Sequence, residues 1–184
     1  MVPRCAGVIA IGVLSAAALS ACGSSTNNSA SLSAAQDISA GIASQGAGQY
    51  AAAAQFYEKA LAIQPKSAVA LYNLGDVEQL QNLDAAAKSH YLAALAVDPN
   101  FISALYNLAT LESSSSPLEA EALYDQVIKL SPNDASAHFN LGYVLISLGH
   151  KAAGDAEINK GIKLNPALAS RVSKGASTTT TTSP

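Results

Sequence analysis

Apolar side chains recur at the spacing of an amphipathic α-helix. Leu71 and Leu74 are three positions apart, and Tyr91 and Leu95 are four apart. Positions three and four apart lie on the same face of a helix. We therefore predict one helix over residues 68–80 and a second over 84–97, joined by a turn. A proline follows at position 99 and ends the second helix, because the residue before a proline disfavours the α conformation.

The same layout repeats along the chain at a nearly constant distance. Four prolines follow apolar helical segments and are separated by 34, 33 and 34 residues: Pro65, Pro99, Pro132 and Pro166. After three of them comes a second shared motif, Leu-Tyr-Asn-Leu-Gly at 71–75, Leu-Tyr-Asn-Leu-Ala at 105–109 and His-Phe-Asn-Leu-Gly at 138–142. A period of about 34 residues predicts stacked helical hairpins, because one hairpin alone cannot bury its apolar side.

This period and these motifs resemble the tetratricopeptide repeat (TPR), and the resemblance covers residues 34–168. It implies an all-α, right-handed solenoid over 34–170, with four helix-turn-helix repeats at about 34–67, 68–101, 102–134 and 135–168. The first repeat is the most degenerate. In the third repeat, Ser116-Pro117-Leu118-Glu119 reads as a capping box, so the second helix of that repeat is expected to begin there after a serine loop over 113–116.

The last repeat departs from good helix chemistry. The family places small residues where helices approach closely, but Gly154 and Gly161 both fall within one predicted helix. Each glycine costs about 1 kcal/mol relative to alanine in a helix interior. We therefore expect this helix to fray, or its apolar edge to pair with another copy or with a partner.

The first 21 residues are interpreted as a lipoprotein signal peptide. One positive charge, Arg4, precedes an apolar run over 6–19 that is shorter than the ~20 residues of a membrane-spanning helix. The stretch Leu-Ser-Ala-Cys at 19–22 resembles the lipobox of bacterial lipoproteins. That resemblance implies a lipidated Cys22, anchored at the outer face of the cytoplasmic membrane, or at the outer membrane if the source has one. The alternatives are an ordinary secretory signal with an incidental cysteine and an uncleaved amphipathic segment.

Both flanks of the solenoid are expected to lack a core. Residues 22–33 are interpreted as a flexible tether, and 171–184, which include an unbroken threonine row, as a disordered tail. The cysteines also fit this interpretation. Cys5 would be removed with the signal peptide and Cys22 would carry the lipid, so the folded part is expected to have no disulfide.

Charge excludes one class of partner. The chain has a formal net charge of −3, and only 12% of its residues are charged. A nucleic-acid-binding protein concentrates Lys and Arg in a basic patch, and this composition offers none. We therefore expect protein or peptide partners and no nucleic acid.

The TPR resemblance implies a binding groove on the concave side, lined by the first helix of each repeat. Asparagine can both donate to and accept from a peptide backbone, and aromatic rings offer contact area at low entropic cost. The alternative is that the asparagine and aromatic side chains of the first helices serve packing between repeats. The positions carried over from the family are Tyr72, Asn73, Asp76, Tyr106, Asn107, Thr110, Phe139, Asn140 and Tyr143.

One TPR subtype does not fit. Chaperone-adaptor members hold a terminal carboxylate with Lys and Arg on the concave helices. The matching positions here carry Ile38, Ile42, Ser103 and Asn107, and Asp76 is the main charge of the groove. An acidic peptide tail is therefore disfavoured.

No catalytic constellation is recognisable. His90, His138 and His150 fall in different repeats or helix faces without metal-ligand spacing, and no thiol remains for nucleophilic chemistry. We expect no enzyme activity, no metal and no cofactor. His138 occupies a core-facing position and is expected to be a packed imidazole.

The sequence therefore predicts a lipid-anchored adaptor of the cell envelope that binds proteins or peptides in its groove. A self-assembling structural module, stacked through the solenoid ends, is the alternative. A small-molecule or peptidoglycan-fragment binder is disfavoured, because a concave solenoid face is broad and open.

Overall fold

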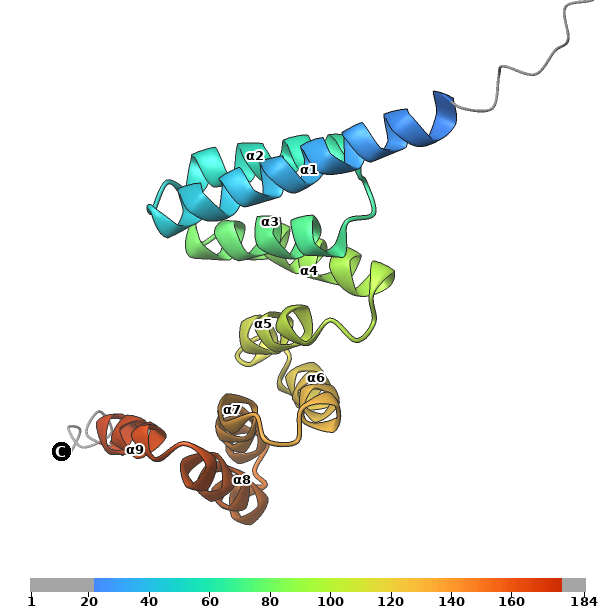
Figure 1. Cartoon of the computed structure of the whole chain (residues 1–184). Coiled ribbons are helices and arrows are strands. Elements are labelled where there is room, and N and C mark those ends of the chain that lie inside the picture. Colours follow the sequence, from blue (N-terminus) through green and yellow to red (C-terminus); the bar gives the residue numbers. More distant parts are fainter. Residues whose placement is uncertain (1–21, 177–184) are drawn as a thin grey trace, which may run out of the picture.

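The structure is a computed structural model that describes residues 22–176, with side chains over 31–172. Within this range the chain forms helices joined by short turns (Figure 1). The signal peptide over 1–21 and the end of the tail over 177–184 lie outside the described residues. The elements are α1 (Cys22–Gly46), α2 (Tyr50–Ile63), α3 (Ala68–Leu80), α4 (Asp84–Val97), α5 (Ile102–Glu112), α6 (Pro117–Leu130), α7 (Ala135–Ser147), α8 (Lys151–Leu164), the 3-10 turn η1 (Pro166–Leu168) and α9 (Ala169–Ala176).

The first eight helices pair as four hairpins, α1/α2, α3/α4, α5/α6 and α7/α8, and each hairpin packs on the next. Figure 1 shows a curved stack, with α5, α7 and α9 bordering its hollow side. The predicted all-α helical-repeat fold is confirmed. The helices predicted over 68–80 and 84–97 have those bounds in α3 and α4.

Each of the first three hairpins closes around one fully buried tyrosine of its second helix: Tyr57, Tyr91 and Tyr124. The facing residue of the first helix is small because the ring lies against its backbone. A Cβ atom built on Gly75 would stand 2.9 Å from Cε1 of Tyr91, closer than such contacts normally occur. Small residues that face these rings, such as Gly75 opposite Tyr91, therefore set the spacing of the two helices in a hairpin.

The loop before α6 folds differently from the predicted capping box. Helix α6 begins at Pro117 as expected, but the Ser116 side chain accepts no capping hydrogen bond. Instead, Ser115 Oγ donates to Glu112 Oε2 at 2.9 Å, and Lys88 Nζ lies 2.5 Å from Glu112 Oε1. The Glu112 side chain is only 3% exposed, so its charge requires these partners.

Both segments that were expected to be flexible contain helix. Residues 22–33, interpreted as a tether, form the first half of α1, which continues without a break to Gly46. Alanine and serine fill half of these positions and are compatible with helix once the packed part of α1 has nucleated it. At the other end, α9 runs to Ala176 and includes the first part of the expected disordered tail.

Helix α8 is continuous through both of its glycines. A Cβ on Gly154 would lie 2.5 Å from the carbonyl oxygen of Gly142, and one on Gly161 would lie 2.7 Å from that of Ala135. The glycines therefore allow α7 and α8 to pack backbone against backbone, and the structure shows no frayed segment in α8. The apolar side of the last hairpin, α7/α8, is partly covered by Leu168 of η1. Leu168 is buried against Phe139 and Ile158.

Candidate partner-binding face

The side of the stack formed by α3, α5 and α7 carries the predicted groove residues, and its asparagines connect neighbouring repeats. Asn107 Nδ2 donates to Asp76 Oδ1 at 3.1 Å. The same nitrogen lies 3.2 Å from the hydroxyl oxygen of Tyr91 and 3.4 Å from that of Tyr72. A carboxylate oxygen only accepts, so the nitrogen end of the amide must face it. The Asn107 side chain on α5 therefore has one orientation, fixed by the preceding repeat.

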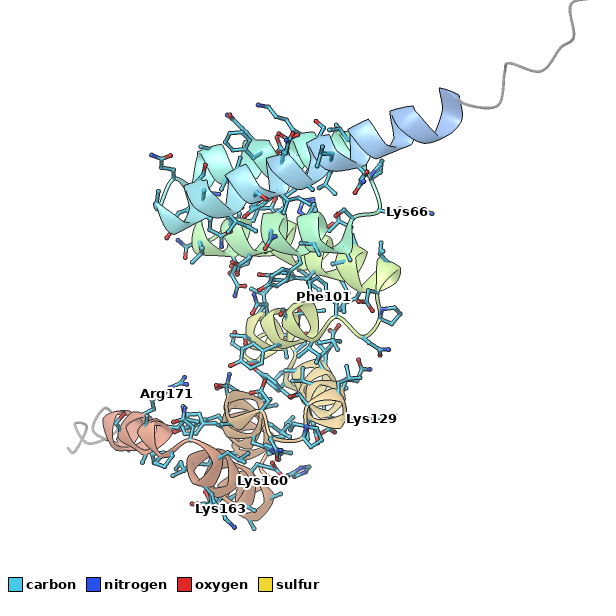
Figure 2. The ribbon with its side chains drawn as sticks, in the orientation of Figure 1. Lys66, Phe101, Lys129, Lys160, Lys163 and Arg171 are labelled. Carbon is cyan, nitrogen blue, oxygen red and sulfur yellow. The ribbon has the colours of Figure 1, made fainter. Side chains whose placement is uncertain are left out.

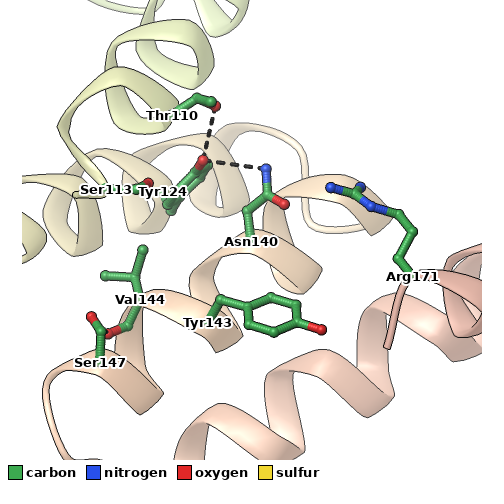
Figure 3. A pocket seen from close by; sticks show the side chains of 8 residues that line it. All are labelled: Thr110, Ser113, Tyr124, Asn140, Tyr143, Val144, Ser147 and Arg171. Carbon is green, nitrogen blue, oxygen red and sulfur yellow. Dashed lines mark hydrogen bonds between the residues drawn. The ribbon is translucent and has the colours of Figure 1, made fainter. Parts of the chain in front are cut away.

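Asn140 on α7 is oriented in the same way by the third repeat. Its Nδ2 lies 2.8 Å from the Tyr106 hydroxyl and 3.3 Å from the Tyr124 hydroxyl. The Thr110 hydroxyl donates its single hydrogen to the Tyr106 carbonyl oxygen. The Tyr124 hydroxyl must therefore donate to Thr110 Oγ1, 2.9 Å away, and its own oxygen accepts from Asn140 (Figure 3).

The oxygen ends of these amides face away from the protein. Among the described residues, neither Asn107 nor Asn140 uses Oδ1 in a hydrogen bond, and no buried side-chain oxygen lacks a partner. The two oxygens therefore reach solvent on the hollow side. Each can accept a hydrogen bond from an N–H group of a bound molecule.

Asn73 and Tyr143 are the least committed of the predicted residues. Asn73 is half-buried, and no other described residue hydrogen-bonds to its side chain. Tyr143 is 41% exposed and rests edge-on against Phe139, with ring centroids 5.1 Å apart. Both can be contacted, or removed, without breaking a hydrogen bond of the fold.

Tyr72 and Tyr106 lie on the open face and also pack against neighbouring side chains. Both are half-buried, and Tyr72 packs edge-on against Phe101 of the next repeat at a centroid distance of 5.1 Å. Burial raises the pKa of both phenols. Asp76 is also engaged, since Gln45 Nε2 donates to its Oδ2 at 2.6 Å.

Phe139 does not line the open face. It occupies the position of Tyr72 and Tyr106 in its repeat, yet only 1% of its surface is exposed, because Leu168 and Arg171 cover it. The sequence holds a signal for this difference. Each tyrosine hydroxyl accepts from an asparagine of the following repeat, whereas no such asparagine follows the last repeat, and phenylalanine has no hydroxyl to satisfy.

Two hollows lie along this face. One, of about 310 Å³, lies between α3, α5 and α7, and its polar lining includes Tyr106, Asn107 and Asp134. The other, of about 320 Å³, is lined by Thr110, Ser113, Tyr124, Asn140, Tyr143, Val144, Ser147 and Arg171 (Figure 3). Arg171 of α9 was missed by the sequence reasoning, which assigned it to the disordered tail.

His138 and His90 each contact a glutamate side chain. His138 is buried, with Nδ1 2.5 Å from Glu157 Oε2 and Nε2 2.9 Å from the Pro132 carbonyl oxygen, which agrees with the predicted packed imidazole. His90 Nδ1 lies 2.7 Å from Glu78 Oε2. Among residues 22–176, no three His, Cys, Asp or Glu side chains are grouped so that they could hold a metal ion.

The fold and its curved, polar-aromatic face define a helical-repeat protein of the kind that serves as an interaction scaffold. Three family models match the chain, described as tetratricopeptide repeat over 39–102 and 135–168 and as TPR repeat over 119–149. The chain is therefore a TPR protein. Members of this family are protein-binding scaffolds and typically not enzymes.

Solved structures agree with the fold. A crystal structure of MamA is 20% identical, covers 74% of this chain and 81% of its own, and has a TM-score of 0.68. MamA from Desulfovibrio magneticus RS-1 is 20% identical over 73% of this chain and 76% of its own, with a TM-score of 0.66. The first TPR domain of Spaghetti (RPAP3), bound to the HSP90 peptide SRMEEVD, is 22% identical over 65% and 95%, with a TM-score of 0.63. At these identities the likeness concerns the fold alone. A search of curated protein sequences gives no match.

Proposed function

We propose that this protein is a membrane-anchored, extracytoplasmic adaptor that binds an extended segment of a partner protein on its α3/α5/α7 face. The observation that carries the proposal is the fixed orientation of Asn107 and Asn140. In both, the nitrogen end is held by tyrosines and the oxygen end faces solvent. Preoriented acceptors of this kind suit the N–H groups of an extended backbone and lose little entropy on binding.

A pull-down after crosslinking in cells tests the face. The informative variant is Asn73→Ala with Tyr143→Ala, since neither side chain hydrogen-bonds within the described fold. Substituting Tyr72 or Tyr106 instead would also disturb packing between repeats. Leu92→Ala is the matched control. Leu92 is 44% exposed and lies on α4, the second helix of its repeat, which is not part of the α3/α5/α7 face. We expect partner recovery to fall several-fold in the double variant alone. Equal recovery from all three proteins would exclude the face.

The anchor is a separate part of the proposal. Its support is the lipobox-like stretch ending at Cys22, which is the first residue of α1. No helix within residues 22–176 has the length and hydropathy needed to cross a bilayer. We expect the mature protein to begin at a diacylated Cys22 and Cys22→Ser to abolish its membrane association. A mass spectrum that shows a free Cys22 thiol would contradict this.

Self-assembly through the last repeat is the second candidate. A hollow of about 450 Å³ lies beyond α8 between Ile158, Ile162, Ala169 and Val172, and Val172 is 36% exposed. Such an apolar edge at a solenoid end can receive a second copy. Light scattering over a range of concentrations separates the two functions, because a stable oligomer that Val172→Asp dissociates would favour assembly.

A further inference from the structure

Arg171 brings a positive charge to the hollow side of the solenoid. It extends from α9 (Figure 2), and its guanidinium carbon lies 4.9 Å from the centroid of the Phe139 ring. Stacking on an aromatic face fixes the plane of the guanidinium and leaves its N–H edge open. Arg171 is exposed, and none of the described carboxylates forms an ion pair with it.

The other polar groups of this hollow are almost all acceptors. The Ser113 hydroxyl donates to the Ala109 carbonyl and the Ser147 hydroxyl to the Val144 carbonyl, each at 2.7 Å. The hydrogens of Thr110 and Tyr124 are used in the chain that orients Asn140. The donors left for a ligand are therefore the guanidinium of Arg171 and the hydroxyl of Tyr143, whereas Asn140 Oδ1 remains as an acceptor (Figure 3).

We propose that this hollow binds a carboxylate of the partner peptide on Arg171, while a peptide N–H next to it donates to Asn140 Oδ1. The inference rests on the proposed function, whose peptide-binding face it extends. A carboxylate pairs with guanidinium through two parallel hydrogen bonds. One cationic donor, Arg171, beside several acceptors matches an anionic group followed by N–H groups. Because Arg171 comes from α9, this subsite differs from the positions at Ile38, Ile42, Ser103 and Asn107, which carry no charge. The sequence-based argument against an acidic ligand overlooked it.

The carboxylate has two possible sources, a peptide C-terminus or an Asp or Glu side chain. Three pools of short random peptides distinguish them: free C-termini without Asp or Glu, amidated C-termini with Asp and Glu, and amidated C-termini without either. Binding of each pool is measured for the protein lacking residues 1–21, for Arg171→Gln and for Lys160→Gln. The last variant removes the same charge from an exposed position on α8. Circular dichroism confirms that each variant is folded.

We expect one acidic pool to bind best, and Arg171→Gln to weaken it roughly tenfold or more while Lys160→Gln leaves it unchanged. Equal binding of the neutral amidated pool, or unchanged acidic binding by Arg171→Gln, would overturn the carboxylate subsite but leave the peptide face intact. Equal weakening of all pools by Arg171→Gln would also overturn it, since Arg171 would then act through its packing on Phe139. If no pool binds, both the subsite and the peptide-binding face are contradicted.

Discussion

The Nδ2 atom of Asn140 lies 2.8 Å from the hydroxyl oxygen of Tyr106, and the two residues belong to neighbouring repeats. Asn107 and Tyr72 form the corresponding pair one repeat earlier, at 3.4 Å. The Tyr-Asn motif that recurs in the sequence therefore joins the second repeat to the third and the third repeat to the fourth. Packing, posed from the sequence as the alternative to partner binding, uses only the nitrogen end of the amide, so the oxygen end remains for the proposed partner.

Removing one of these asparagines should loosen the junction between repeats. We expect Asn140→Ala to lower the free energy of unfolding by about 1–2 kcal/mol, because two tyrosine hydroxyls lose a donor in a half-buried place. Urea denaturation followed by circular dichroism measures this. Asn159→Ala is the matched control, since Asn159 is exposed on α8 and gains the same helix propensity. An equal effect of both substitutions would show that Asn140 contributes nothing special.

The glycines of the last repeat should resist substitution. In an open helix, Gly→Ala stabilises by roughly 1 kcal/mol, yet a Cβ at position 154 would stand 2.5 Å from a backbone oxygen of α7. We expect Gly154→Ala to destabilise the protein by about 1–3 kcal/mol, the usual cost of overpacking. Thermal unfolding measures it. Gly46→Ala is the control, because nothing lies within 4 Å of a Cβ built there. A stabilising Gly154→Ala would disprove the close packing of α7 and α8.

The buried Glu112 carboxylate should make the protein sensitive to acid. Its hydrogen bond with Lys88 is the largest cause that holds its pKa below the ordinary value of 4.5. The unfolded chain then binds the proton more readily, so this contribution is full above about pH 5 and is lost as the pH falls through the lowered pKa.

Unfolding free energy measured in urea between about pH 3 and 6 tests this contribution. Glu112→Gln should flatten the pH dependence, whereas Glu119→Gln should leave it in place, because Glu119 is 46% exposed and 3.9 Å from Lys88. The same steep loss in all three proteins would assign the acid sensitivity to other groups.

Local patterns predicted the helices well but could not show what covers the last repeat. The bounds of α3 and α4 follow from apolar spacing and the proline after each hairpin, which are local signals. The burial of Phe139 and the placement of Arg171 depend on how α9 folds back, a contact between distant segments that no spacing rule contains. The orientation of Asn140 likewise requires knowing which hydroxyl hydrogens are already used.

The central claim is that the α3/α5/α7 face, and not the outer surface, receives the partner. Site-specific photocrosslinking in cells tests it most directly, with a benzoylphenylalanine placed at position 73 on α3 or at position 92 on α4. The account predicts a crosslinked envelope protein from position 73 and none from position 92. The same adduct from both positions, or from position 92 alone, would contradict it.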